Sequence, residues 1–202
     1  MKNLKLNTSC LLDEFKEHSN IKDTLVSLIK DAKSEVLNTT NEYYGDNIHR
    51  VDWNDNLNYE RPWVKYIKPY LEKQLKKYAN YLGYNDVVIK GMWFQQYNTN
   101  GKHGWHIHGE NYTGVYYVTF NNKCGKTELI NPLSQDKKFT INAKEGDIVI
   151  FPSFVIHRAS KQKTNDIKLI ISFNIEFKDI DPILFDKIDN LQSENQLWVK
   201  LK

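Results

Sequence analysis

Hydrophobic positions change their spacing near Val87, and this change divides the chain into a helical part and a strand-rich part. Between residues 20 and 37 apolar side chains recur every three or four residues, and a similar stripe with lysines opposite runs through residues 61–82. This period predicts two amphipathic helices. Pro62 suits the first turn of the second helix, and Gly83 suits its end. A short strand before the first helix also fits the pattern.

After Val87 the period becomes strand-like, in short runs rich in β-branched and aromatic residues. A series of short strands after two helices predicts an antiparallel sandwich or barrel with flanking helices, a mostly β fold. Residues 38–59, between the two helices, are polar and have the composition of a long irregular loop. The predicted strands are 87–97, 105–108, 113–120, 126–130, 138–142, 147–151 and 167–177.

The 202 residues contain no Pro-, Ser- or Gly-rich linker, so we expect a single domain. Its parts would be a helical region of about 1–85, a β core of about 86–178 and a tail, 179–202, that docks as a helix or frays. A content of 40% hydrophobic, 13% aromatic and 26% charged residues is typical of a folded globular protein. No apolar run approaches the roughly 20 residues that span a membrane, and the first residues do not resemble a signal peptide. We therefore expect a cytoplasmic protein.

The charge pattern indicates no nucleic-acid partner. The net charge is only +3, and the lysines are spread along the chain without a dense basic run. Cys10 and Cys124 lie far apart and lack the spacing of a zinc site, so we expect two free thiols. The oligomeric state stays open.

Candidate chemistry concentrates in Trp93–Val118, WFQQYNTNGKHGWHIHGENYTGVYYV, which holds three of the six histidines. If the chain is extended there, His106 and His108 project from one face and Ile107 from the other. Two neighbouring imidazoles form half of a transition-metal site for iron, zinc, copper or nickel. His103 stands in a polar turn, where a solvated loop histidine is expected and a mobile site residue is the less favoured alternative.

A second segment, EGDIVIFPSFVIH (Glu145–His157), supplies a further candidate ligand. Its order of turn glycine, apolar strand, proline and histidine resembles the second motif of cupins and of the wider double-stranded β-helix class, whose core is a jelly roll. Cupins carry a glycine where this chain has Phe154. The resemblance implies a cupin-like, jelly-roll barrel in which His157 completes the metal site.

The strand that begins at Lys168, KLIISFNIEF, has two different faces. Lys168, Ser172 and Asn174 share one face, and the other face is wholly apolar. A lysine that points into a barrel needs an anion, because burying an isolated ammonium is costly. A dicarboxylate cosubstrate would supply that anion, whereas a lysine on an edge strand would only discourage aggregation.

Together these motifs resemble the 2-oxoglutarate- and Fe(II)-dependent oxygenases of the prolyl-hydroxylase-like kind. The matched pieces, within about residues 88–177, are Tyr97 with Gly101, HIH in place of the family's HxD, GVYYV, GDIVIFP with His157, and KLIISFN. HIHGENYTGVYYV and ISFN are also similar to an HxH subgroup of such oxygenases found in phages and bacteria.

The resemblance implies a role for each matched side chain. His106 and His157 would bind iron, and Lys168 would pair with the distal carboxylate of 2-oxoglutarate. The cosubstrate pocket would be completed by Tyr97 and Tyr117, which donate hydrogen bonds, and by Ser172 and Asn174, which line it. Without this context, the two tyrosines would be read as ordinary core aromatics.

The third iron ligand is where this chain departs from the family, because His108 stands at the position of the usual carboxylate. Either the site uses His106, His108 and His157, or the register shifts and His108, Glu110 and His157 are the ligands. We prefer the three histidines, since Glu110 falls where the chain should leave the strand.

The leading functional hypothesis is an Fe(II)- and 2-oxoglutarate-dependent dioxygenase that hydroxylates an unidentified substrate. A peptidyl residue such as proline and a free small molecule both fit. The alternative is a cupin-type metalloenzyme, a dioxygenase or isomerase with three histidines, that does not use 2-oxoglutarate. A third hypothesis is a jelly-roll binding module whose metal is structural or absent.

Overall fold

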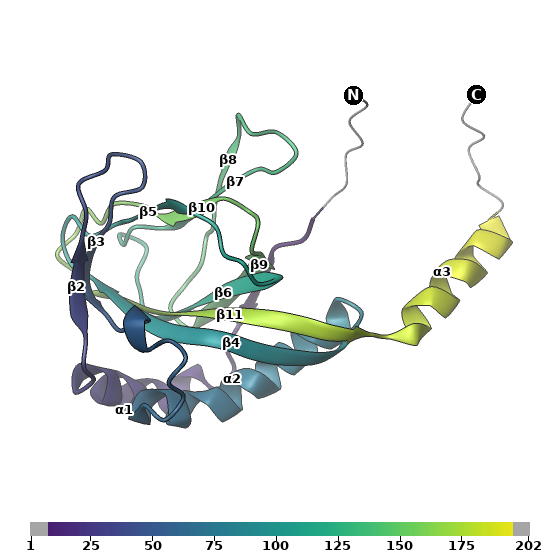
Figure 1. Cartoon of the computed structure of the whole chain (residues 1–202), viewed down its shortest axis with the longest axis horizontal. Coiled ribbons are helices and arrows are strands. Elements are labelled where there is room, and N and C mark those ends of the chain that lie inside the picture. Colours follow the sequence, from purple (N-terminus) through teal and green to yellow (C-terminus); the bar gives the residue numbers. More distant parts are fainter. Residues whose placement is uncertain (1–7, 196–202) are drawn as a thin grey trace.

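The computed structural model describes the backbone of residues 8–195 and the side chains of residues 8–188. Two antiparallel sheets face each other, and two helices cover the outer side of the larger sheet (Figure 1). This is the jelly-roll core with flanking helices that the sequence predicts.

The larger sheet has seven strands and the smaller sheet has four. The order across the larger sheet is β1 (Leu11–Glu14), β9 (Asp147–Pro152), β6 (Tyr112–Thr119), β11 (Lys168–Ile180), β4 (Tyr84–Tyr97), β3 (Asn47–Val51) and β2 (Glu35–Asn38). The order across the smaller sheet is β5 (His103–His106), β10 (His157–Ala159), β7 (Thr127–Ile130) and β8 (Lys138–Thr140).

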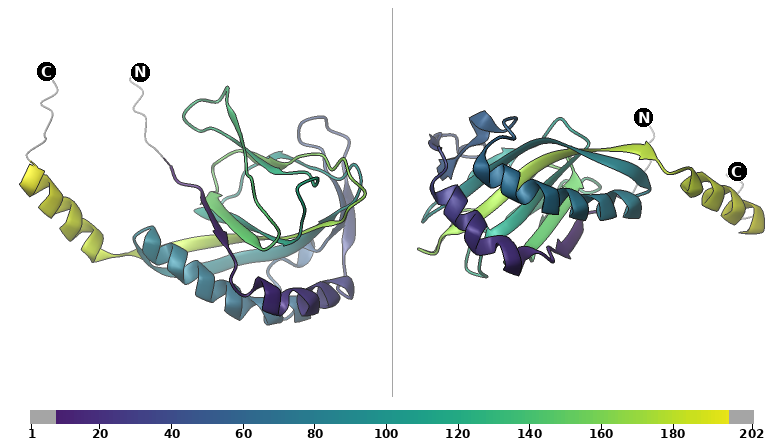
Figure 2. Two further views of the ribbon diagram at one scale, coloured as in Figure 1. Left: turned by 180° about the vertical axis from the view of Figure 1, so that it is seen from behind. Right: turned by 90° about the horizontal axis from the view of Figure 1, so that it is seen from below.

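Helices α1 (His18–Lys30) and α2 (Pro62–Tyr81) lie side by side across the larger sheet (Figure 2). Their apolar stripes are buried against the outward-facing side chains of the central strands. Helix α2 follows the predicted range, but α1 ends earlier than expected. Residues 35–37 of the predicted helix instead belong to β2, because they pair with β3.

Strand β11 separates two apolar layers, as its alternation predicts. Leu169, Ile171 and Phe173 belong to the layer beneath the helices, whereas Ile170 belongs to the barrel interior. Lys168 and Ser172, on the same face as Ile170, are buried. The polar face of this strand therefore points into the barrel.

The predicted loop at residues 38–59 is partly regular, which corrects the prediction. It contains β3 and the short 3-10 helix η1 (Trp53–Asp55). Strand β3 pairs with the end of β4, a partner distant in sequence. Asp52 anchors the segment by accepting hydrogen bonds from the Arg61 guanidinium, the Trp63 indole and the Phe94 backbone N–H.

The predicted tail includes helix α3 (Pro182–Asn195), which extends away from the two sheets (Figure 2). Its side chains Ile183 and Phe185 are exposed. Within residues 8–195, every helix is too short or too polar to cross a membrane. Both cysteines are free thiols, Cys10 exposed and Cys124 buried, as expected.

Candidate metal centre

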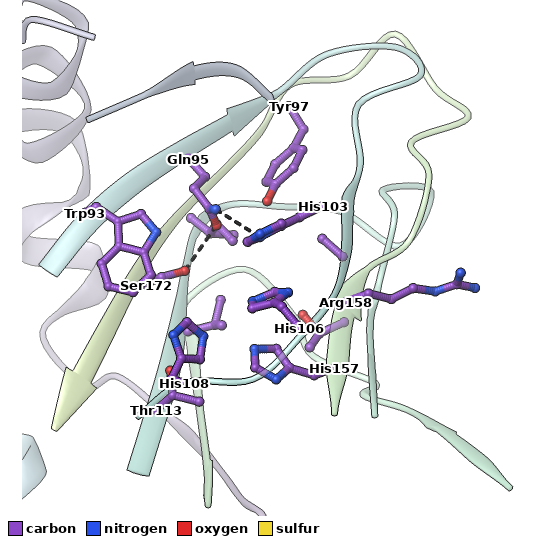
Figure 3. A pocket seen from close by; sticks show the side chains of 14 residues that line it. Trp93, Gln95, Tyr97, His103, His106, His108, Thr113, His157, Arg158 and Ser172 are labelled. Atoms are coloured by element: carbon purple, nitrogen blue, oxygen red, sulfur yellow. Dashed lines mark hydrogen bonds between the residues drawn. The ribbon is translucent and has the colours of Figure 1, made fainter. Parts of the chain in front are cut away.

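Three histidines meet between the sheets, at the ends of two adjacent strands (Figure 3). His106 ends β5 and His157 begins β10, and the two residues pair directly in the smaller sheet. His108 lies two residues beyond β5, where its backbone N–H donates to the Ser153 carbonyl at 3.1 Å. The potential ligand atoms of the three side chains lie within 4.8 Å of one another. A single metal ion could contact all three.

Hydrogen bonds orient two of these rings. His106 Nδ1 lies 2.8 Å from the Gly104 carbonyl, and His157 Nδ1 lies 2.9 Å from the Val155 carbonyl. A carbonyl only accepts, so each Nδ1 carries the proton and each Nε2 keeps its lone pair for a metal. Such orientation of the second ring nitrogen is common among metal-binding histidines.

Burial keeps these imidazoles in the neutral form that binds metals. It lowers the pKa of His106 and holds that of His157 well below its usual range. Burial and the neighbouring His106 ring lower the pKa of His108 to about 4. Near neutral pH no proton has to be displaced when a metal binds.

Glu110 does not join this cluster. Among the described residues, the only group of His, Cys, Asp or Glu side chains close enough to share a metal is His106, His108 and His157. The chain bends away from the strand at Gly109 and Glu110. This arrangement favours the three-histidine set over the set with Glu110.

A fourth histidine, His103, also belongs to the site, so the expected solvated loop position is wrong. His103 begins β5, because the bridge between Asn47 and Lys102 draws the preceding turn onto the larger sheet. Its ring stacks on His106 with 3.8 Å between centroids. His103 therefore supports a candidate ligand from behind.

A chain of polar contacts holds the His103 ring (Figure 3). Ser172 Oγ donates to Gln95 Oε1 at 3.2 Å, and the Gln95 amide nitrogen lies 3.3 Å from His103 Nδ1. An amide nitrogen only donates, so Nδ1 accepts and the ring proton is on Nε2. That nitrogen faces Asp46 Oδ1 at 3.6 Å. The sequence marks neither Gln95 nor Asp46, since their relation to the histidines is purely tertiary.

Lys168 is buried in the barrel with only neutral partners. Its side chain is among the largest fully buried ones, and the residue is 1% exposed. The ammonium donates to the Gly125 carbonyl at 2.6 Å and lies 4.9 Å from the centre of the Tyr97 ring. Burial lowers its pKa to about 8. The central position of β11 excludes an edge-strand role.

The two candidate tyrosines differ in their contacts. Tyr117 Oη donates to Thr127 Oγ1 at 2.7 Å. Tyr97 Oη is buried without a hydrogen-bond partner in the described part of the chain, and burial raises its pKa well above the usual value. An unpaired buried hydroxyl is costly, so Tyr97 is suited to bind a polar ligand.

A small cavity lies beside the histidines. Its lining includes Tyr97 and Ser172 together with His106, His108 and His157. The other three predicted cosubstrate residues, Tyr117, Lys168 and Asn174, lie outside this lining. The Asn174 side chain instead accepts from Thr113 Oγ1 at 3.1 Å.

Residues 91–174 match the family model described as "Putative 2OG-Fe(II) oxygenase". The match contains all the histidines of the cluster and Lys168. This segment is therefore similar to the 2-oxoglutarate- and Fe(II)-dependent oxygenases. The family uses Fe(II) as its metal and 2-oxoglutarate as its cosubstrate.

Solved structures of oxygenases share the fold. An oxidoreductase of the 2OG-Fe(II) oxygenase family from Burkholderia pseudomallei has a TM-score of 0.63 at 10% identity, covering 79% of this chain and 80% of that one. A Trichoplax adhaerens prolyl hydroxylase, solved with a hypoxia-inducible factor peptide, has a TM-score of 0.58 at 14% identity and 83% coverage of both chains.

HygX from Streptomyces hygroscopicus, solved with nickel and 2-oxoglutarate, has a TM-score of 0.58 at 9% identity, covering 85% of this chain and 84% of that one. At these identities the likeness concerns the fold. A comparison with curated protein sequences finds no match.

The residues of the site fit the metal and the cosubstrate of that family. Neutral imidazoles with free Nε2 lone pairs suit Fe(II). A buried ammonium and an unpaired buried hydroxyl suit a dicarboxylate. The ligand charge differs from the family's usual site. Two histidines and one carboxylate lower the net charge of a divalent metal site by one, whereas three neutral imidazoles would leave it unchanged.

Proposed function

We propose that this oxygenase hydroxylates a C–H bond of an organic substrate, with Fe(II) held by His106, His108 and His157. The bound iron and 2-oxoglutarate supply the oxidising chemistry: dioxygen, 2-oxoglutarate and R–H become R–OH, succinate and carbon dioxide. The protein supplies the binding groups and their orientation. One observation carries the proposal: a buried ammonium with no anionic partner among the described residues lies in the same barrel as a three-histidine cluster.

Lys168 and Tyr97 would bind the distal carboxylate of 2-oxoglutarate. A carboxylate that reaches Lys168 replaces its bond to the neutral Gly125 carbonyl with a charge-assisted one, which is about twice as strong. It also gives the Tyr97 hydroxyl the acceptor that it lacks. Tyr117 would contribute a second hydroxyl by giving up Thr127, and Ser172 would complete the wall.

The two negative charges of 2-oxoglutarate complement the three-histidine set. A divalent ion held by neutral imidazoles keeps both of its charges; the dianion would bring one negative charge to the metal and one to Lys168. This complementarity favours a 2-oxoglutarate-dependent site over a cupin-type site that uses the histidines alone. Lys168 also has no role in a plain cupin site.

The proposal leaves two substrate classes open. One is a peptidyl residue such as proline, because the Trichoplax prolyl hydroxylase with the same fold was solved with a peptide. The other is a free small molecule, such as an amino acid.

The test is succinate formation by the purified protein with Fe(II), ascorbate and 2-oxoglutarate. We expect slow, uncoupled succinate production without substrate. His157→Ala should abolish it, whereas His49→Ala, which changes an exposed histidine on β3, should leave it intact. No succinate across a range of Fe(II) concentrations and candidate substrates contradicts the proposal. Metal-dependent oxygen consumption without 2-oxoglutarate would support the cupin-type alternative.

A further inference from the structure

A second cavity adjoins the first one and lies between the histidine cluster and strand β3. His106 and His108 form part of its wall. Most of the remaining lining is apolar, with Ile48, Val51 and Trp93 buried. A molecule in this cavity would therefore lie next to the metal centre.

Asp46 is the one acidic residue in this lining. Its side chain is only 15% exposed. Oδ1 accepts the Gly104 backbone N–H at 3.0 Å and faces His103 Nε2, whereas no described residue donates a hydrogen bond to Oδ2. A partly buried carboxylate with an open oxygen calls for a donor, and a cation is the strongest one.

The described residues provide no lysine or arginine for this carboxylate. The ion pairs of residues 8–188 place only His103 within 4.0 Å of Asp46. Lys102, next in sequence to His103, directs its ammonium toward the Glu42 carbonyl, 3.4 Å away. The charge of Asp46 is thus left for a ligand.

Aromatic faces complete the arrangement. Trp53 from η1 and Trp93 from β4 both line the cavity. Indole faces attract cations within about 6 Å, and tryptophan does so most strongly among aromatic side chains. One carboxylate and two indoles in an apolar cavity match an ammonium group on a small hydrocarbon body.

We infer that the substrate of this oxygenase carries an aliphatic ammonium group, which Asp46 binds while a nearby C–H bond faces the metal centre. The inference rests on the proposed function, and it specifies the substrate class. A proline within a peptide chain carries neither a charge nor an N–H, so it leaves Asp46 unpaired. Of the two open substrate classes, the cavity therefore favours a free small molecule, one that carries an ammonium group.

The test is calorimetric titration of the Zn(II)-loaded protein in the presence of 2-oxoglutarate. The probes are cyclopentylamine, the neutral cyclopentanol, cyclopentanecarboxylate and acetyl-proline amide. We expect the amine to bind about tenfold more tightly than the alcohol, since a charge-assisted contact exceeds a neutral one by about 1.4 kcal/mol. The carboxylate should bind most weakly.

Asp46→Asn removes the charge and keeps an acceptor for the Gly104 N–H. It should weaken amine binding about tenfold and change alcohol binding less than twofold. Asp23→Asn, an exposed change on α1, is the matched control and should leave all four affinities unchanged. Thermal melting of both variants verifies the fold.

Any of four results overturns the inference. Cyclopentylamine does not bind at 100 mM, cyclopentanol or cyclopentanecarboxylate binds more tightly than the amine, acetyl-proline amide binds more tightly than the amine, or the preference for the amine survives Asp46→Asn.

These outcomes are separate from the proposed function. Succinate production without an amine preference refutes only the substrate class. An Asp46-dependent amine preference without 2-oxoglutarate turnover refutes only the oxygenase reaction.

Discussion

Replacing Lys168 by methionine should stabilise the protein and abolish its response to 2-oxoglutarate. Methionine has nearly the shape of the lysine stem, so the change removes the charge without opening a large cavity. In the ligand-free protein the ammonium is fully buried, with one carbonyl and two aromatic rings as neighbours.

The magnitude follows from the pKa of Lys168, which burial lowers from 10.5 to about 8. A difference of that size corresponds to roughly 3 kcal/mol of unfavourable free energy for the charged form. Losing the hydrogen bond to the Gly125 carbonyl returns about 1 kcal/mol. Lys168→Met should therefore raise the free energy of unfolding by about 2 kcal/mol near neutral pH, or the melting temperature by roughly 4–8 °C.

This gain should depend on pH in a defined direction. Between pH 8 and 10.5 the unfolded chain keeps the Lys168 proton and the folded protein has lost it, so wild-type stability rises with pH in this window. The free-energy cost of burying the charged Lys168 is fully present below about pH 8 and disappears above 10.5. The stability difference between Lys168→Met and wild type should shrink from pH 7 to pH 10.

Urea denaturation with Mn(II), with and without 2-oxoglutarate, measures both effects. At a concentration 100-fold above its dissociation constant, 2-oxoglutarate should stabilise the wild type by about 2.7 kcal/mol. The Lys168→Met protein should show little of this shift. Lys144→Met, which changes an exposed lysine, is the matched control and should keep the full ligand response.

Two results would show that the reasoning is wrong. A Lys168→Met protein less stable than wild type by 1 kcal/mol or more would mean that the ammonium is stabilised by its present contacts. A full ligand response in that variant would mean that 2-oxoglutarate does not reach Lys168.

Two further predictions concern the metal centre. His108→Ala should weaken Fe(II) affinity at least about tenfold more than Glu110→Ala in an anaerobic metal titration, because only the histidine lies in the cluster; equal losses would place the carboxylate among the ligands. His103→Ala should lower Fe(II) affinity about tenfold, because the His106 ring loses its support, with little change in urea stability. Unchanged metal affinity would make His103 a packing residue only.

Much of the fold could be predicted from local patterns. The apolar stripe of α2 and the alternation of apolar and polar residues in β11 each mark the face that is buried. The spacing of apolar residues along the sequence is therefore enough to predict these two elements. Strands β2 and β3 could not be found this way, because these short segments form strands only through pairing, β2 with β3 and β3 with β4. The same reason shortens α1, since the end of its predicted range pairs with β3.

The candidate site was partly visible in the sequence. The HxH spacing and the histidine after GDIVIFP indicate metal ligands, and the three rings meet in the structure. The supporting contacts of His103 with Gln95 and Asp46 were hidden, because β4, β5 and the segment before β3 meet only in the folded barrel.

The sequence by itself thus determined the fold class, the family motifs and the inward face of Lys168, all of which depend on residue types at short, regular spacing. Only the tertiary structure decided that Glu110 lies outside the cluster, that Lys168 has no anionic partner among residues 8–188 and that Asp46 lines a cavity beside the histidines. These properties depend on distances between segments far apart in the chain, and local spacing carries no information about such distances.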